Sequence, residues 1–314
     1  MRFVFILALL FSLQANAQGY PSKPVKLVVP FPAGSATDQV ARLTGQQLQE
    51  VLKHPFVVEN KPGAQGSIAA EFVASSAPDG YTLMLTTNTP QAANVSLFKK
   101  LPYDPVKDFE PVARLGTTSF MLMVKPEFPA KNLKEFLVHV GSQPGKLSSG
   151  YGSAGSQVSQ VMLKSMGRLD FVDVPYKGIP QAITDVLGGT LSFTFVDLGN
   201  ALAQAKGGKL RGIAVTSARR TPLAPDVPAV AEELKGYELI AWFALVAPAG
   251  TPKEIVELLY QVSVKGITKN EVTEKFAAIG TDVAPMSPAE LAGFIKSEIA
   301  KWAVMVKQAG IQLE

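Results

Sequence analysis

The chain has 314 residues, of which 47% are hydrophobic and 18% are charged, and its formal net charge is +4. The Lys and Arg residues are dispersed rather than clustered, which excludes a nucleic-acid-binding surface, and the length suits up to two ordinary domains. The absence of Cys excludes disulfide bonds and lipid attachment through an N-terminal Cys.

The first 17 residues have the pattern of a secretion signal. Arg2 precedes an apolar run from Phe3 to Leu13, and Ala15-Asn16-Ala17 supplies a cleavage site with small residues. The run is shorter than the about 20 apolar residues that a transmembrane helix needs. We therefore expect residues 1–17 to be removed and the mature chain to be soluble in a bacterial periplasm.

Short apolar runs alternate with amphipathic segments after the signal, as is typical of β-α-β units on a mainly parallel sheet. Strand 25–29 leads through a tight turn to a helix over 37–52. Strand 56–59, helix 67–75 and strand 81–87 follow. Three strands and two crossing helices form half of a doubly wound domain.

The same alternation recurs further along the chain. We expect strands over 120–124, 149–151, 171–174, 192–196, 210–216 and 239–247. We expect helices over 133–140, 180–187, 252–264, 271–278 and 288–309, and one that follows the segment 152–156 and ends at about 166. The pattern predicts two α/β lobes with crossing strands near 117–124 and 239–247. The first lobe comprises residues 18–118 and 240–314, and the second comprises residues 119–239.

The turn before the first helix holds candidate ligands for an anion. A helix N-terminus presents unpaired N–H groups and the positive end of the helix dipole. Gly34 permits a close approach of the backbone, and we favour a binding role for Gly34, Ser35 and Ala36. Thr37 and Asp38 add polar groups, but Ser35 and Asp38 also approximate a capping box, so Asp38 is either a cap or a ligand contact.

Other polar and apolar residues lie at predicted strand ends. Phe31 stands between two prolines, where a cleft would explain its presence. Thr87 and Asn88 close the third strand, either as a turn that ends it or as cleft-facing groups. Because ligands of open α/β sheets bind outside the carboxyl ends of the strands, we favour the cleft.

The residues Gly150-x-Gly152-x-x-Gly155 suggest a rival function, dinucleotide binding, with Asp170 and Asp173 near the spacing of a ribose-binding acid. Three observations count against dinucleotide binding. The motif lies in the middle of the chain, and the lobe after it is too short for a full dinucleotide-binding fold. Export also removes the protein from the nicotinamide pool. The glycines would equally allow backbone N–H groups to reach a carboxylate.

Catalytic signals are few. His54 and His139 are the only histidines, which leaves no His-dependent triad or clustered metal site, and we expect neither a cofactor nor a metal. Two alternatives to carboxylate binding stay open: an exported hydrolase or isomerase that uses Asp38 or Asp197, and a receptor for an amine or another cation that uses the same acids.

The strand-end motifs together resemble the periplasmic solute-binding proteins of tripartite tricarboxylate transporters, the Bug-type receptors. The similarity runs through residues 20–24, 29–34 with Asp38 and Arg42, 58–64, 77–83, 101–105, 174–178, 214–217 and 247–252. It implies a type II periplasmic-binding-protein fold, the two-lobed "Venus flytrap". It also implies a receptor that is not an enzyme, closes on a small mono- or dicarboxylate, and delivers it to integral-membrane permease subunits. We expect such a receptor to be a monomer.

The resemblance also assigns the site. The first-lobe contacts that it implies are Ala33, Gly34, Ser35, Thr37 and Asp38, with Thr87 and Asn88 beside them. The second-lobe contacts are Ser153, Ala154, Gly155, Ser156 and Gln157, with Tyr176, Lys177 and Asp197. Ser35, Gln157 and Val161 depart from residues common in the family, which leaves the identity of the ligand open, aliphatic or aromatic.

Overall fold

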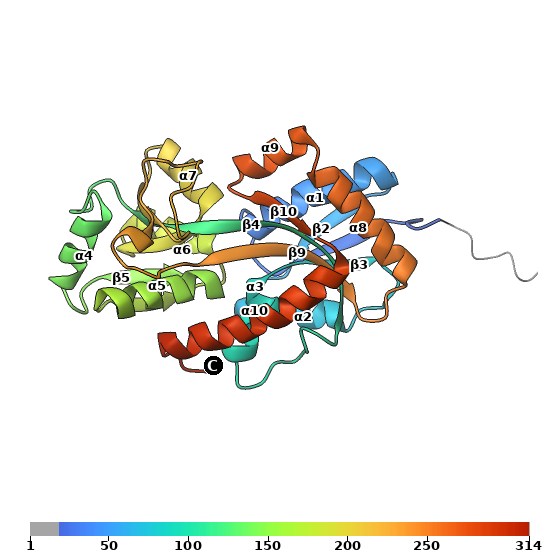
Figure 1. Cartoon of the computed structure of the whole chain (residues 1–314), viewed down its shortest axis with the longest axis horizontal. Helices are drawn as coiled ribbons and strands as arrows, with labels where there is room; N and C mark the ends of the chain where they lie inside the picture. Colours follow the sequence, from blue (N-terminus) through green and yellow to red (C-terminus); the bar gives the residue numbers. More distant parts are fainter. Residues whose placement is uncertain (1–18, 314) are drawn as a thin grey trace, which may run out of the picture.

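The computed structural model describes residues 19–313, which form two α/β lobes on one continuous path of strands (Figure 1). In the described part of the chain the strand order is β2-β1-β3-β9-β4-β7-β5-β6, and β10 and β8 also pair with β4. The predicted arrangement of two α/β lobes is confirmed. The predicted signal peptide, residues 1–17, lies outside the described residues.

Parallel strands form the centre of the first lobe. Leu27 and Leu83 belong to one hydrophobic core, whereas their neighbours Val28 and Met84 belong to another on the opposite face. Both faces are buried because helices cover them, which explains the continuous apolar runs. The elements are β1 (Val25–Val29), α1 (Ala36–Leu52), β2 (Phe56–Asn60), η1 (Ala64–Gly66), α2 (Ser67–Ala74), β3 (Thr82–Thr87), α3 (Asn88–Gln91) and η2 (Ala93–Ser96).

The second lobe repeats this layering around strand β5, which is parallel to both β6 and β7. Its aromatic core includes Phe193, whose ring meets Phe136 and Phe171 edge to face. The elements are α4 (Leu133–Gly141), β5 (Ser148–Tyr151), α5 (Ala154–Gly167), β6 (Val172–Pro175), α6 (Ile179–Gly188), β7 (Phe193–Asp197), α7 (Leu198–Lys206), β8 (Arg211–Val215) and η3 (Val230–Glu232).

Two strands run between the lobes, and Figure 1 shows them crossing the middle of the molecule. β4 (Phe109–Val124) pairs with β9 (Ile240–Pro248) up to Ser119, and from Phe120 onward it pairs with β7. The predicted strand 120–124 is thus only the end of β4. Pro111 and Gly116, which read as strand breakers, are accommodated where the register with β9 shifts.

The C-terminal segment returns to the first lobe. It contains α8 (Lys253–Ile267), α9 (Asn270–Ala278), β10 (Asp282–Met286) and α10 (Pro288–Ala309). α10 is fixed to crossing strand β9 by a buried carboxylate, because Glu298 Oε2 accepts hydrogen bonds from Trp242 Nε1 at 2.8 Å and from Trp302 Nε1 at 3.3 Å. Helix α7 and strand β10 were not predicted from the sequence, where Gly199 and Pro285 interrupt their patterns.

Candidate functional site

A cavity of about 430 Å³, open at its mouth, lies where strands of both lobes end. Strands β1, β3, β5 and β7 each lead into it through residues at or just after their C-terminal ends. The lining residues are Phe31, Ser35, Ala36, Thr37, Thr87, Asn88, Thr89, Thr118, Phe120, Gly152, Ser153, Ile179, Asp197, Ala241 and Phe243.

The predicted site residues divide into two groups. Those that line the cavity are Phe31, Ser35, Ala36, Thr37, Thr87, Asn88, Ser153 and Asp197. Those that lie behind or beside it are Ala33, Gly34, Asp38, Ala154, Gly155, Ser156, Gln157, Tyr176 and Lys177. The sequence analysis did not identify Phe243, which also lines the cavity. The alternation of side chains along a strand could have identified it. Ala241 and Phe243 point to the face opposite Trp242, and both line the cavity.

Helix α1 presents free backbone donors to the cavity. Ser35 is its N-cap, with an extended backbone and a side-chain oxygen that accepts from the Asp38 amide at 3.3 Å. Ala36 and Thr37 follow as the first two helical residues, which have no acceptor inside a helix. Among residues 19–313 no acceptor faces their amides, so these two N–H groups are available to a ligand.

Asn88 supplies a side-chain donor to the same cavity. It follows Thr87, whose hydroxyl oxygen accepts from the Thr89 amide at 3.2 Å and shapes the turn. Asn88 is only 2% exposed, and its Nδ2 has no hydrogen-bond partner in the described chain. A buried donor without an acceptor costs about 1–3 kcal/mol, and a ligand oxygen would remove that cost.

The second-lobe turn before α5 is organised by its own serines. Ser153 caps α5, and its side chain and that of Ser156 form a capping box. Gly152 allows the backbone of Gly178 to approach, since a Cβ there would lie 2.3 Å from the Gly178 carbonyl carbon. The glycines of the dinucleotide-like motif therefore serve close packing. The Ala154 amide donates to Thr89 Oγ1 at 3.2 Å, which links the two lobes.

Asp197 is the acidic residue of the cavity. It caps α7, where its Oδ1 accepts from the Asn200 amide and its Oδ2 from Asn200 Nδ2, both at 3.2 Å. Burial raises the pKa of Asp197 above its ordinary value, and the hydrogen bonds from Asn200 offset only part of this effect.

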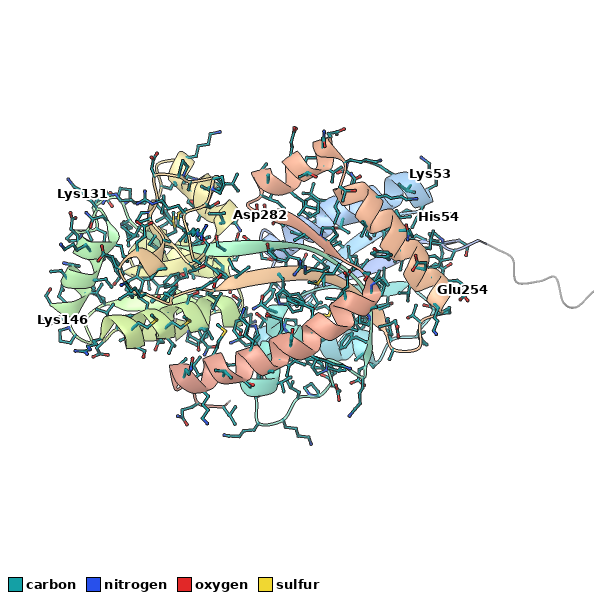
Figure 2. The ribbon with its side chains drawn as sticks, viewed as in Figure 1. Lys53, His54, Lys131, Lys146, Glu254 and Asp282 are labelled. Atoms are coloured by element: carbon teal, nitrogen blue, oxygen red, sulfur yellow. The ribbon has the colours of Figure 1, made fainter. Side chains whose placement is uncertain are left out.

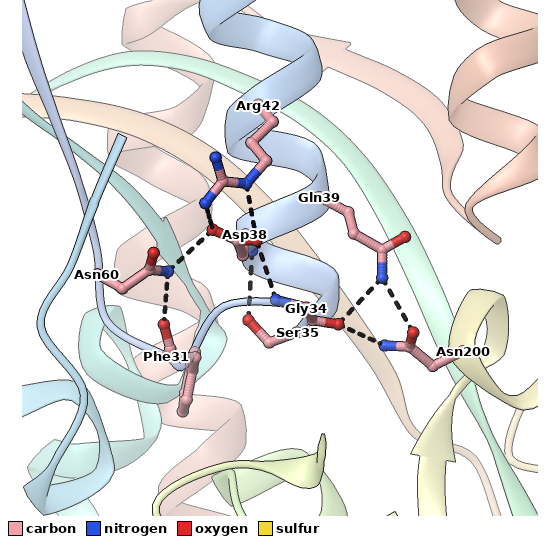
Figure 3. A network of polar contacts seen from close by, with 8 residues as sticks. All are labelled: Phe31, Gly34, Ser35, Asp38, Gln39, Arg42, Asn60 and Asn200. Atoms are coloured by element: carbon pink, nitrogen blue, oxygen red, sulfur yellow. Dashed lines mark hydrogen bonds and ion pairs between the residues drawn. The ribbon is translucent and has the colours of Figure 1, made fainter. Parts of the chain in front are cut away.

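Asp38 lies behind the turn, and its oxygens are occupied (Figure 3). They accept from the Gly34 amide at 3.0 Å, from Nε and Nη2 of Arg42 at 3.0 Å and from Asn60 Nδ2 at 2.9 Å. Burial opposes ionisation, but the hydrogen bonds from Arg42, Gly34 and Asn60 outweigh it and lower the pKa of Asp38. Gly34, at φ +82°, holds the left-handed conformation that directs its amide to this carboxylate.

Replacing Asp38 by Asn should destabilise the fold by about 2 kcal/mol at pH 7, because the Gly34 amide and Arg42 lose a charged acceptor. A carboxyl with a lowered folded pKa stabilises above its unfolded pKa of about 3.9 and loses this contribution as the pH falls through the folded value. In urea unfolding, the difference in the free energy of unfolding between wild type and Asp38→Asn should therefore shrink below about pH 4. Exposed Asp226→Asn is the control, and an equal difference at pH 7 and pH 3 would contradict the assignment.

Side chains from both lobes bond to one another at the edge of the cleft (Figure 3). Asn200 Nδ2 donates to the Gly34 carbonyl at 3.1 Å, and Asn200 Oδ1 accepts from Gln39 Nε2 at 3.0 Å. A separate bond joins Gln65 Nε2 to Gln157 Oε1 at 3.0 Å. These bonds hold the lobes together. Gln39 and Gln65 are not among the residues that line the cavity.

Gln39→Ala should shift the molecule toward an open form, because it removes the hydrogen bond from Gln39 of the first lobe to Asn200 of the second. A net loss of about 1 kcal/mol changes the closed-to-open ratio roughly fivefold. Small-angle X-ray scattering should show a larger radius of gyration than for wild type. Gln46→Ala, which removes only a bond to Glu50 within α1, should leave the radius of gyration unchanged. Equal radii for both variants would show that the bond between Gln39 and Asn200 does not hold the lobes closed.

No Lys, Arg or His is among the residues that line the cavity. Figure 2 shows Lys131 and Lys146 at the outer end of the second lobe and Lys53, His54 and Glu254 at the outer end of the first. Within residues 19–313 no group of His, Cys, Asp and Glu is placed to hold a metal ion. No described helix combines the length and apolar character needed to cross a membrane.

Comparison with known proteins gives a consistent result. Residues 40–311 match the family described as the tripartite tricarboxylate transporter family receptor. The protein BugT of Bordetella pertussis is 33% identical over 99% of this chain and 97% of its own length.

Solved structures agree. Rpa4515 of R. palustris, determined with adipate, has a TM-score of 0.92 and 32% identity, covering 94% of this chain and 100% of its own. MatC of Rhodopseudomonas palustris, determined with bound malate, has a TM-score of 0.84 and 34% identity, covering 91% and 100%. The periplasmic-binding-protein fold is thereby confirmed. The chain belongs to the receptor family of tripartite tricarboxylate transporters, which is a family of transport receptors and not of enzymes.

Proposed function

We propose that this protein is an extracytoplasmic receptor that binds a small carboxylate between its lobes and delivers it to a tripartite tricarboxylate-type permease. The observation that carries the proposal is a set of unpaired donors in one cavity, the amides of Ala36 and Thr37 and Nδ2 of Asn88. A carboxylate has two oxygens with about four acceptor positions, which is enough for all three. Hydrogen bonds to an ionised acceptor are roughly twice as strong as neutral ones.

Neutral dipoles, rather than cations, hold the ligand in this proposal. No Lys or Arg is among the residues that line the cavity. The start of α1 supplies partial positive charge through its free amides. Such a site avoids the cost of removing a cationic side chain from water.

The remaining walls suit a carbon skeleton. Phe31, Phe120, Phe243 and Ile179 are each 5% exposed or less and line the cavity. Apolar walls of this kind accept an aliphatic or an aromatic acid. Adipate in Rpa4515 and malate in MatC support the choice of a carboxylate.

Receptor function also requires export and closure. We propose that residues 1–17 are a signal peptide and that the mature receptor acts as a periplasmic monomer. We further propose that residues 18–118 with 240–314 move against residues 119–239 as the two lobes. The change of partners along β4 at Ser119 and Phe120 supports this boundary, and hinge closure of this kind is common in binding proteins.

Isothermal titration calorimetry against a panel of acids tests the function. Protein unfolded in guanidine, dialysed and refolded would be titrated with mono- and dicarboxylates, aromatic acids and the matching amides. At least one acid should give saturable heat at one site per chain, and its amide should give none. Heat equal to that of buffer for every acid would overturn the proposal.

The same samples separate the two alternatives. A receptor returns its acid unchanged, whereas an exported hydrolase or isomerase converts it, which NMR of the recovered ligand would detect. An amine receptor would give heat with amines and none with acids. The neutralisation of Asp38 by Arg42 favours the carboxylate over the amine.

A further inference from the structure

Asp197 is the one ionisable side chain among the residues that line the cavity. It is 5% exposed, and the other polar lining groups are hydroxyls, an amide and backbone. An anionic ligand would therefore enter a cavity that already contains an acid and no cationic side chain.

Asn200 holds this carboxyl group in place. It donates to both carboxylate oxygens, at 3.2 Å each, through its backbone amide and its Nδ2. Nδ2 also donates to the Gly34 carbonyl of the first lobe at 3.1 Å (Figure 3). Asp197 thus keeps one orientation, and each of its oxygens retains acceptor capacity.

The chemistry of Asp197 limits what can lie beside it. A second ligand carboxylate would be repelled by a like charge. A hydroxyl group can donate to the ionised form of Asp197 and accept from the protonated form. An ammonium group can pair only with the ionised form of Asp197, whereas a hydroxyl group can pair with either form. The hydroxyl group therefore suits this acid best.

We propose that Asp197 makes the site selective for carboxylates that also carry a hydroxyl group. One lobe then binds the carboxylate through Ala36, Thr37 and Asn88, and in the other lobe Asp197 accepts a hydrogen bond from the ligand hydroxyl group. The inference rests on the proposed function and names the ligand class for the same cavity. Asp197 contacts the ligand directly, and Asn200 is a positioning residue.

Calorimetry with matched acids tests the inference. L-malate against succinate, and 3-hydroxybutyrate against butyrate, differ only in the hydroxyl group. Wild type should bind the hydroxylated acid at least about tenfold more tightly, as expected for one hydrogen bond to a charged group. L-aspartate tests the ammonium group at the same position.

Two variants separate recognition from capping. Asp197→Asn preserves shape, and Asp197→Ser preserves a side-chain oxygen for the α7 cap. In both, the preference for the hydroxyl group should fall below about threefold, as the acceptor charge is lost, while the deoxy acid binds as well as before or better. Asp226 is an exposed residue of the same lobe, and Asp226→Asn should leave the affinity for both ligands of a pair unchanged.

Three results would overturn the inference. Wild type could bind each pair equally, both variants could weaken the two acids of a pair by the same factor, or aspartate could bind more tightly than malate. If no acid of the panel binds at all, the proposed carboxylate function fails first, and this inference fails with it.

Discussion

Asn88→Asp should weaken carboxylate binding roughly ten-thousandfold or more. The substitution removes a hydrogen bond to a charged group, which contributes about 1.5–3 kcal/mol. It also places a like charge near the ligand, and two such charges about 4 Å apart repel by roughly 4 kcal/mol at an effective dielectric constant of 20. Calorimetry with the tightest acid of the panel measures the change.

Two controls interpret this loss. Asn88→Leu removes the donor without adding charge and should cost about ten- to a hundredfold. Asn270→Asp makes the same change of net charge at the exposed start of α9 and should bind normally. Near-normal affinity in a folded Asn88→Asp variant, verified by circular dichroism, would place the carboxylate elsewhere.

Ala36→Pro should weaken binding about ten- to a hundredfold, because it deletes one amide donor and little else. Position 36 is the first helical residue of α1, where proline is well tolerated. Ser35 has φ −66° and ψ 159°, the extended backbone that a residue before proline prefers. The variant therefore tests a backbone N–H group that no side-chain substitution reaches.

Asn270→Pro is the matched control for this backbone change. Asn270 is the first residue of α9 and follows Lys269 at φ −70° and ψ 135°. The thermal stability of this variant should equal that of Ala36→Pro. Its affinity for the ligand should equal that of wild type. Unchanged affinity in Ala36→Pro would show that the start of α1 does not hold the ligand.

Local signals in the sequence predicted several of the residues that line the cavity. The run 25–29 and the helix after it share a turn whose free amides follow from helix geometry alone. Asn88 was found because it ends a predicted strand, and strand ends of parallel sheets gather at one edge. Both inferences need only short stretches of chain.

Contacts between segments that are distant in the sequence could not be predicted from such local signals. Asn200 and Gln39 meet although 161 positions separate them, and neither has a motif that announces a partner. The oxygens of Asp38 accept hydrogen bonds from Arg42, Gly34 and Asn60. Of these, Asn60 lies at the end of strand β2, 22 positions away in the sequence. Such pairings depend on how the lobes meet, which residue spacing does not encode.

The carboxylate of Glu298 joins Trp242 and Trp302, which are the two tryptophans of the chain. Trp242 stands between Ala241 and Phe243, which face the cavity from the same strand. Tryptophan fluorescence of the unlabelled protein therefore arises from two indoles that share Glu298, one of which lies between two residues that line the cavity. Any rearrangement of β9 that accompanies occupancy would alter their emission, so the molecule carries its own optical reporter for stopped-flow measurements.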